Sequence, residues 1–175
     1  LDNAGITTVK EIHMPRRSIP PITLPEYERL FRTIHAVVAN EQGDPTKAAL
    51  FFAVAGAYLL KRHHKLSSAC PVAGVAGYNL RTPTNFSMVF GRSENDIFVS
   101  DTETFHCWVE ADGWIIDVLA PLFDGMAPAD RKGAVIPRFM FQKPVIADAN
   151  TISLDTPGAY LHIPNDRLTT NLMQE

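Results

Sequence analysis

Two helices are predicted near the start of the chain from the spacing of its apolar residues. Residues 23–26 read Thr-Leu-Pro-Glu, a capping box, and apolar residues then recur every three or four positions up to Asn40. A second helix is expected to begin at Pro45, behind an Asp44 cap, and to end near Arg62. Because this helix is apolar on nearly all sides, we expect it to be buried at the centre of the domain.

The next part of the chain is expected to form strands. Turn-forming residues, such as those at 81–84 and 91–95, separate five strand-like runs, which cover 72–80, 85–90, 96–99, 104–110 and 114–119. Helices followed by consecutive strands are typical of α+β domains. We therefore predict an α+β fold in which N-terminal helices, one of them long and buried, pack on an antiparallel meander of about five strands.

Length and composition indicate one domain. The chain has 175 residues, of which 46% are hydrophobic and 20% charged, so it can bury a sizeable core. We predict a single domain over 1–175, with an extended arm at 1–22, core helices and sheet at 23–119, and a less regular covering segment at 120–175. Within that segment, residues 159–164 are expected to form a short strand and 166–173 a short helix.

A hairpin near the middle of the chain places a histidine beside an aspartate. The Asp-Gly pair at 112–113 favours a type I′ turn, because both residues tolerate positive φ. With Ala111 opposite Trp114, side-chain alternation makes His106 and Asp117 diagonal neighbours on one face. A carboxylate there can accept a proton from the imidazole and fix its tautomer, which predicts an oriented general base. The alternative is a buried histidine that a carboxylate satisfies for structural reasons.

This hairpin resembles the His/Asp hairpin of the papain-like and transglutaminase-like cysteine-enzyme superfamily. The resemblance rests on His106, Trp108, Val109, Glu110, Trp114 and Asp117. It implies a cysteine at the start of a long buried helix whose thiolate attacks a carbonyl, a histidine that serves as general base and acid, and an aspartate that orients it. The run 47–60 also resembles an uncharacterised bacterial domain-of-unknown-function family within that superfamily.

Alanine occupies the position where the resemblance implies the nucleophile. In the papain-like pattern, a glutamine that donates to an oxyanion lies six residues before the cysteine, and six residues after Gln42 is Ala48. Matching the later Leu-Leu-Lys-Arg to related peptidases favours Ala49 instead. Neither residue has a thiol. The histidine and aspartate therefore serve another residue, belong to a degenerate enzyme, or have lost their cysteine by a replacement in this chain.

The two cysteines of the chain lie elsewhere. Cys107 follows His106 directly, so alternation points it to the opposite face of the strand, where we expect it to pack in the core. Cys70 precedes the first predicted strand and is a candidate nucleophile that could approach His106 from a neighbouring strand. It would lack the helix N-terminus that lowers a thiol pKa, and its alternative interpretation is a small apolar residue at a strand edge.

Composition excludes several other functions. A net charge of −3 and a pI near 6.1 give no electrostatic footprint for nucleic acid, and the longest apolar run, 13 residues, is too short to cross a bilayer. We find no phosphate-binding glycine loop, and the histidines lack the spacing of a zinc motif, so neither a cofactor nor a metal is expected. Two cysteines on different elements favour a reducing compartment, which predicts a soluble cytoplasmic protein.

These observations lead to three hypotheses about function. The first is a thiol hydrolase or acyl transferase by ancestry, in which His106 is the base, Asp117 orients it, Gln42 donates to an oxyanion, and Ala48 or Ala49 stands in the nucleophile position. Its partner would be a peptide or a small acyl substrate. The second is a non-catalytic module that binds such compounds, and the third is an active cysteine enzyme that uses Cys70. No pattern in the sequence indicates an oligomeric state.

Overall fold

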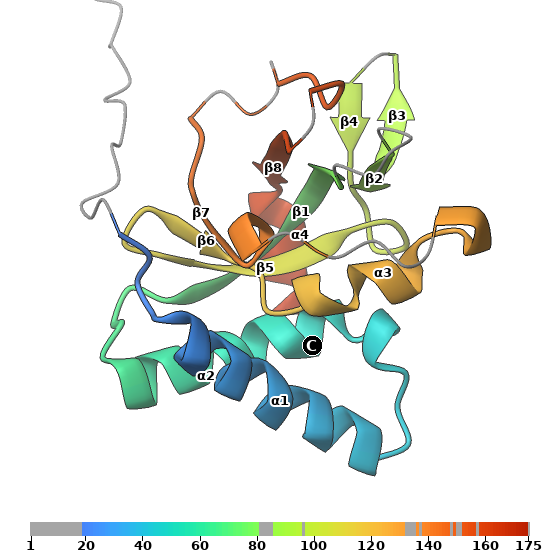
Figure 1. Ribbon diagram of the computed structural model, residues 1–175. Coiled ribbons are helices and arrows are strands. Elements are labelled where there is room, and N and C mark those ends of the chain that lie inside the picture. The colour runs from blue at the N-terminus through green and yellow to red at the C-terminus, as the bar shows by residue number, and fades with distance from the viewer. Residues whose placement is uncertain are drawn as a thin grey trace, which may run out of the picture.

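Two long helices lie under a curled antiparallel sheet (Figure 1). The computed structural model describes residues 19–80, 86–95, 97–131, 136, 138–147, 149, 152–156 and 158–174. The α-helices are α1 (Leu24–Asn40), α2 (Ala49–His64), α3 (Phe123–Met126) and α4 (Asp166–Leu172). The strands are β1 (Cys70–Asn79), β2 (Ser87–Phe90), β3 (Arg92–Glu94), β4 (Ile97–Val99), β5 (His106–Ala111), β6 (Trp114–Ile116), β7 (Gln142–Pro144) and β8 (Tyr160–Pro164). The predicted α+β class is confirmed.

The first helix agrees with the prediction at both ends. The capping box is present at the start of α1, where the main-chain amide and the hydroxyl of Thr23 both donate to the Glu26 carboxylate at 2.7 Å. The helix ends at Asn40. Its buried residues lie at i, i+3 and i+4 spacing and face the sheet and α2; they are Tyr27, Leu30, Ile34 and Val38.

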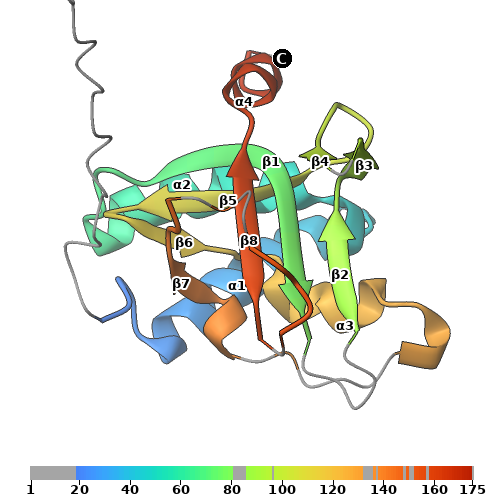
Figure 2. The same cartoon turned by 90° about the horizontal axis from the view of Figure 1, so that it is seen from above.

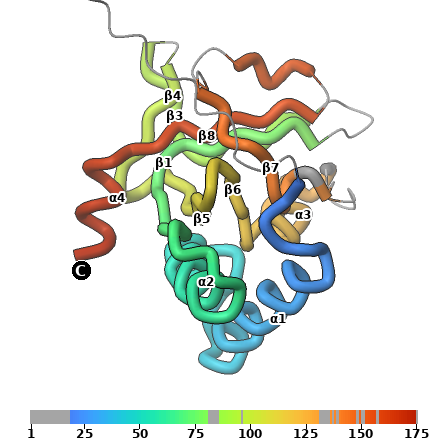
Figure 3. The backbone as a smooth tube through the Cα atoms, turned by 90° about the vertical axis from the view of Figure 1, so that its left-hand side faces the viewer, coloured from blue at the N-terminus to red at the C-terminus, as the bar shows by residue number. Residues whose placement is uncertain are grey.

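The second helix differs from the prediction in its start and its burial. Residues 45–47 form a 3₁₀ turn capped by Asp44, and the α-helix begins only at Ala49. The prediction that this helix is buried on all sides is also wrong. On one side, Phe51, Val54 and Tyr58 are 43%, 42% and 57% exposed. The physical reason is that α2 lies in an outer layer, where α1 and the sheet cover only part of its circumference (Figure 3).

The central strand of the sheet is β1, because three other strands pair with it. β5 pairs with residues 70–74 of β1, β2 with residues 76–79 and β8 with residues 74–78. The strand bends between its two halves, so the sheet curls (Figure 2). From β5 the sheet continues to β6 and β7, which gives six strands, while β3 and β4 form a separate two-stranded ribbon.

The strand order departs from the predicted meander. A meander would place β2 to β4 between β1 and β5, whereas β1 and β5 are direct neighbours. β3 also lies within residues 91–95, which were predicted to be a turn. Alternation of apolar residues indicates a strand, but it does not identify the partner of that strand.

The covering segment predicted at 120–175 takes part in the fold. It supplies β7 and β8 to the main sheet as well as α3 and α4, so its description as an irregular cover was incomplete. The predicted strand at 159–164 and helix at 166–173 correspond to β8 and α4 and are confirmed. Of the arm predicted at 1–22, residues 1–18 lie outside the described residues, and the main chain of Ile22 exchanges two hydrogen bonds with the Gln142 side chain.

The predicted hairpin is present with the predicted register. Asp112 and Gly113 have φ values of 51° and 80°, and Ala111 is paired with Trp114. The two faces of β5 have different surroundings. Cys107, Val109 and Ala111 point toward the helices, while His106 and Trp108 point into the curl of the sheet.

Candidate functional site

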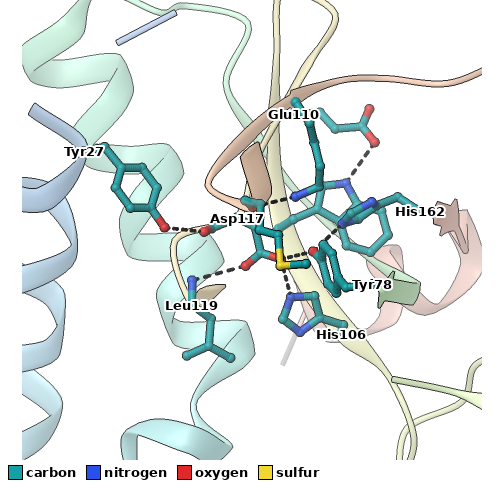
Figure 4. A network of polar contacts seen from close by, with 10 residues as sticks. Tyr27, Tyr78, His106, Glu110, Asp117, Leu119 and His162 are labelled. Atoms are coloured by element: carbon teal, nitrogen blue, oxygen red, sulfur yellow. Dashed lines mark hydrogen bonds and ion pairs between the residues drawn. The ribbon is translucent and has the colours of Figure 1, made fainter. Parts of the chain in front are cut away.

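His106 and Asp117 are in direct contact inside the curl of the sheet. His106 is the first residue of β5, and Asp117 follows β6 directly. The His106 Nε2 atom lies 2.8 Å from the Asp117 Oδ2 atom, and the two side chains are 1% and 0% exposed (Figure 4). The contact expected from the hairpin register is therefore present, and it is shielded from solvent.

Every polar group of Asp117 has a hydrogen-bond partner. Oδ2 accepts from His106 and from the Tyr78 hydroxyl, and Oδ1 accepts from the Leu119 amide at 3.2 Å. The main-chain carbonyl accepts from the Tyr27 hydroxyl at 2.5 Å, and the amide donates to the Phe141 carbonyl at 3.0 Å. The side chain and main chain of Asp117 are thus held from α1, β1 and β5 and from the segment before β7.

The environment keeps the Asp117 carboxylate ionised. Burial alone would raise the pKa of Asp117, but His106, the charge of Lys143 and the Tyr78 hydrogen bond outweigh it and lower that pKa below its usual value. Lys143 is itself 1% exposed, and burial lowers the pKa of its ammonium group to about 8. Its Nζ atom donates to the Met140 carbonyl at 2.7 Å and lies 4.7 Å from the centre of the Tyr78 ring.

The second nitrogen of His106 has no polar neighbour among the described residues. Nε2 points at Asp117, whereas Nδ1 is buried and no described donor or acceptor lies within hydrogen-bonding distance of it. Two aromatic rings hold the imidazole in place. The Phe90 ring stacks on it with the ring centres 4.6 Å apart, and the centre of the Phe123 ring of α3 lies 5.7 Å away. In neutral His106, donation from Nε2 to the carboxylate leaves the lone pair on Nδ1, where a general base needs it.

The segment before α2 is connected to this histidine through α3. Ala48 is the N-terminal cap residue of α2 and Ala49 is its first residue; both are half-buried and pack on the core. The preceding 3₁₀ turn contacts α3, and α3 carries Phe123, which touches the His106 ring. The turn that precedes the two alanines and the histidine therefore contact the same short helix.

Sequence reasoning missed several members of this site. Tyr78, Lys143 and Tyr27 surround the aspartate, His162 contacts Tyr78, and none of the four was assigned a role. Tyr78 and His162 were recognised only as parts of predicted strands. The available signal was a polar residue inside an otherwise apolar strand, as at Tyr78 and His162, but such residues are also common in ordinary cores.

Comparison with known proteins identifies the family of the chain. A family model described as a protein of unknown function (DUF2026) matches residues 23–175. The chain belongs to the DUF2026 family. The protein is also similar to the crystal structure of a genomics target, with 29% sequence identity and a TM-score of 0.71, over 91% of this chain and 74% of the other. No curated protein matches the chain. The expected membership of an uncharacterised domain-of-unknown-function family is thus confirmed.

The structure does not bring the cysteines of this DUF2026 protein to the histidine. Cys70 is paired with Glu110, whereas His106 is paired with Gly74, four residues further along β1, or about 13 Å away. Burial and the nearby Glu110 raise the pKa of the Cys70 thiol. Cys107 packs with Ala53 and Ala73 on the other face of β5, as expected, and burial raises its pKa to about 12.

Gln42 is exposed in the structure. It lies after the end of α1 with a positive φ of 59°, and its main-chain amide donates to the Ala39 carbonyl. The side chain was predicted to donate to an oxyanion, and that role stays a prediction. Glu110 is only partly exposed and accepts from the Trp108 indole at 3.0 Å; burial raises its pKa.

The described part of the DUF2026 chain contains no group of three or more histidine, cysteine or acidic residues arranged to hold a metal ion. Among the described helices, none is both long enough and apolar enough to cross a bilayer. The described site contains an oriented imidazole beside a buried carboxylate.

Proposed function

We propose that this DUF2026 protein has a papain-like, transglutaminase-like site of the acyl-transfer type in which alanine has replaced the nucleophilic cysteine. His106 is the base of that site, Asp117 orients it, and Ala48 or Ala49 occupies the nucleophile position. In its present form the chain does not form a covalent acyl intermediate at this position, because alanine has no nucleophilic atom.

The observation that supports this proposal is the orientation of His106. Its Nε2 is bound to Asp117, while its Nδ1 is buried without a hydrogen-bond partner among the described residues. An unpaired buried nitrogen is energetically unfavourable, so an explanation is needed for its retention. A thiol donor at the start of α2 would satisfy that nitrogen.

A cysteine in that position would react in a defined order. The thiol proton would move to Nδ1 of His106, and the thiolate would attack the carbonyl carbon of an amide or thioester. The protonated histidine would then give its proton to the leaving group as the tetrahedral intermediate collapses to a thioester. Water or a second acyl acceptor would release the product by the reverse sequence, with His106 again acting as base. The substrate class is therefore a peptide or a small acyl compound.

The experiment that tests this proposal restores the thiol. In Ala48→Cys and Ala49→Cys, the rate of alkylation at the new cysteine is followed against pH by peptide mass. We expect one of the two variants to have a thiol pKa below about 7, because His106 and the start of α2 both stabilise the thiolate. The same variant combined with His106→Ala should lose most of that shift.

A cysteine elsewhere on the same helix provides the matched control. Val54 is 42% exposed on α2, so Val54→Cys should react with a pKa near the ordinary value of about 8.5. If neither Ala48→Cys nor Ala49→Cys has a lower pKa than Val54→Cys, the nucleophile position is wrongly assigned. A low pKa that survives His106→Ala would mean that the helix alone causes it, and the proposed base would be rejected.

The second candidate is a non-catalytic module that binds a peptide or small acyl compound. The absence of a nucleophilic side chain at Ala48 and Ala49 favours it. Peptides that shift the NMR signals of the ring protons of His106 and are recovered unchanged after long incubation would support binding without turnover. The third hypothesis, catalysis by Cys70, conflicts with the strand register, which keeps Cys70 away from His106.

A further inference from the structure

The Asp117 carboxylate has a second hydrogen-bond donor beside His106. The hydroxyl of Tyr78 donates to Asp117 Oδ2, the same oxygen that accepts from His106, and it also lies 2.7 Å from the Nε2 atom of His162 (Figure 4). All four side chains are buried, with exposed fractions between 0% and 5%. A continuous hydrogen-bonded row therefore runs from His106 through Asp117 and Tyr78 to His162.

The direction of each hydrogen bond in this row follows from the number of protons available. An ionised carboxylate only accepts, and a tyrosine hydroxyl has one proton to donate. Because Tyr78 gives its proton to Asp117, its oxygen must accept from Nε2–H of His162. His162 is then neutral, in agreement with the low pKa that burial and the charge of Lys143 give it.

Packing fixes the rings of Tyr78 and His162 in this row. The Tyr78 ring contacts Phe123, at a centroid distance of 4.8 Å, and its centre lies 4.7 Å from the Lys143 ammonium nitrogen. The His162 ring meets the face of Trp108 edge-on at 4.7 Å. A cation over the ring also makes the phenol a stronger hydrogen-bond donor to the carboxylate. Neither the Tyr78 ring nor the His162 ring can move away from its partner without disturbing the core.

We propose that Tyr78 and His162 are positioning residues for the His106 base. They hold Asp117 so that it accepts from Nε2–H of His106 and thereby keeps the lone pair on Nδ1, the atom to which the proposed function assigns the thiol proton. The inference deepens the proposed function and rests on it. A phenylalanine at position 78 and an apolar residue at 162 would fill the same core volume, so packing alone does not require these polar groups.

The tautomer of His106 tests this inference without any need for activity. Side-chain ¹⁵N signals of the histidines are compared in the wild-type protein, in Tyr78→Phe and in the control Tyr160→Phe. Tyr160 also lies near Lys143, at 5.7 Å, but its hydroxyl donates to the Pro144 carbonyl at 3.2 Å and not to Asp117. We expect the Nε2–H form of His106 in the wild type and in Tyr160→Phe, and a shift of its ¹⁵N signals toward a mixture of tautomers in Tyr78→Phe.

A second readout connects the positioning by Tyr78 to chemistry. In whichever of Ala48→Cys and Ala49→Cys has the lowered thiol pKa, adding Tyr78→Phe should raise that pKa by about one unit, since one hydrogen bond to a charged group is lost. Adding Tyr160→Phe should leave it unchanged. If neither cysteine variant has a lowered pKa but the tautomer still shifts, the proposed function fails while the positioning by Tyr78 stands.

Other results would overturn the inference. A folded Tyr78→Phe protein with unchanged His106 signals would show that Asp117 needs no help from Tyr78. If Tyr78→Phe does not fold, His162→Phe replaces it and should produce the same shift to a smaller extent. The wild-type protein provides a check that depends on no variant: His162 with its proton on Nδ1 instead of Nε2 contradicts the proposed row.

Discussion

The two faces of strand β5 meet very different surroundings, although their residues alternate along one short segment. The face of Cys107 and Val109 packs on the helices with apolar atoms alone. The face of His106 and Trp108 points into the curl of the sheet, where it meets a carboxylate, two tyrosines and a lysine. Both faces are buried to the same extent, with each of these four residues at most 1% exposed.

The comparison teaches that equal burial can rest on different physical terms. On the helix side, stability comes from apolar area removed from water and from close packing, so the loss from a truncation grows with the volume removed. Inside the curl, the hydrogen bonds and ion pairs of Asp117 offset the cost of removing its polar groups from water. Removal of one member there leaves the others unpaired, so a change of a few atoms has a larger effect than its volume suggests.

The largest expected effect comes from removal of the shared carboxylate. Asp117→Ala leaves His106 and Tyr78 without their acceptor and Lys143 without its counter-charge, so the free energy of unfolding should fall by about 3–5 kcal/mol. Glu103→Ala, which removes an exposed acidic residue, should change it by less than about 0.5 kcal/mol. Urea unfolding measures both, and similar values for the two variants would contradict the distinction between the faces.

The next effect concerns the buried lysine inside the curl. Because the pKa of Lys143 is lowered from 10.5 to about 8, the unfolded chain binds more protons than the folded chain between these values, and Lys143 contributes stability that rises with pH across this window. Lys143→Met removes this contribution. Relative to the variant, the wild type should gain about 2 kcal/mol of unfolding free energy between pH 7.5 and 9.5.

Denaturant unfolding at these two pH values checks the prediction for Lys143. Lys61→Met, in which an exposed lysine of α2 is replaced, controls for the loss of one positive charge. An unchanged difference between wild type and Lys143→Met at the two pH values would mean that Lys143 does not titrate in the folded protein as its burial requires.

A smaller effect is expected on the helix side of the strand. Val109→Ala removes two methyl groups from a site that is 0% exposed and packs near Gly56 of α2, so it should lower the free energy of unfolding by about 2 kcal/mol. It should leave the ¹⁵N signals of His106 unchanged, because no polar partner is lost. Val37 lies on α1 and is 46% exposed, so Val37→Ala should change the free energy of unfolding very little. A shift of His106 signals in Val109→Ala would mean that the two faces are coupled.

The smallest effect is a difference in thiol reactivity without a change in stability. With a pKa of about 12, only about one Cys107 thiol in ten thousand is ionised at pH 8, so Cys107 should remain unmodified while exposed Cys70 is alkylated. Mass spectrometry of the peptides after alkylation measures this. His106→Ala should leave the Cys70 rate unchanged, and a slower rate would revive the hypothesis that Cys70 acts with His106.

The contact between His106 and Asp117 could be predicted because it depends on short-range geometry. An Asp-Gly turn fixes the register of a two-residue hairpin, and strand alternation then determines which side chains share a face. The same local rules gave the ends of α1 and the core position of Cys107. They could not supply Tyr78 or His162, which come from β1 and β8 and meet the hairpin only after the sheet has curled.

The sequence by itself determined the α+β class, the hairpin with its histidine and aspartate, and the lack of a thiol at Ala48 and Ala49. Only the tertiary structure decided that β1 pairs with β2, β5 and β8, that one side of α2 stays exposed, and that Tyr78, Lys143 and Tyr27 surround Asp117. The physical reason is the distance along the chain over which each kind of interaction acts. Turn chemistry and residue periodicity act between neighbours along the chain, whereas strand pairing and the pairing of buried charges join residues that are distant in sequence and become specific only when the core closes around them.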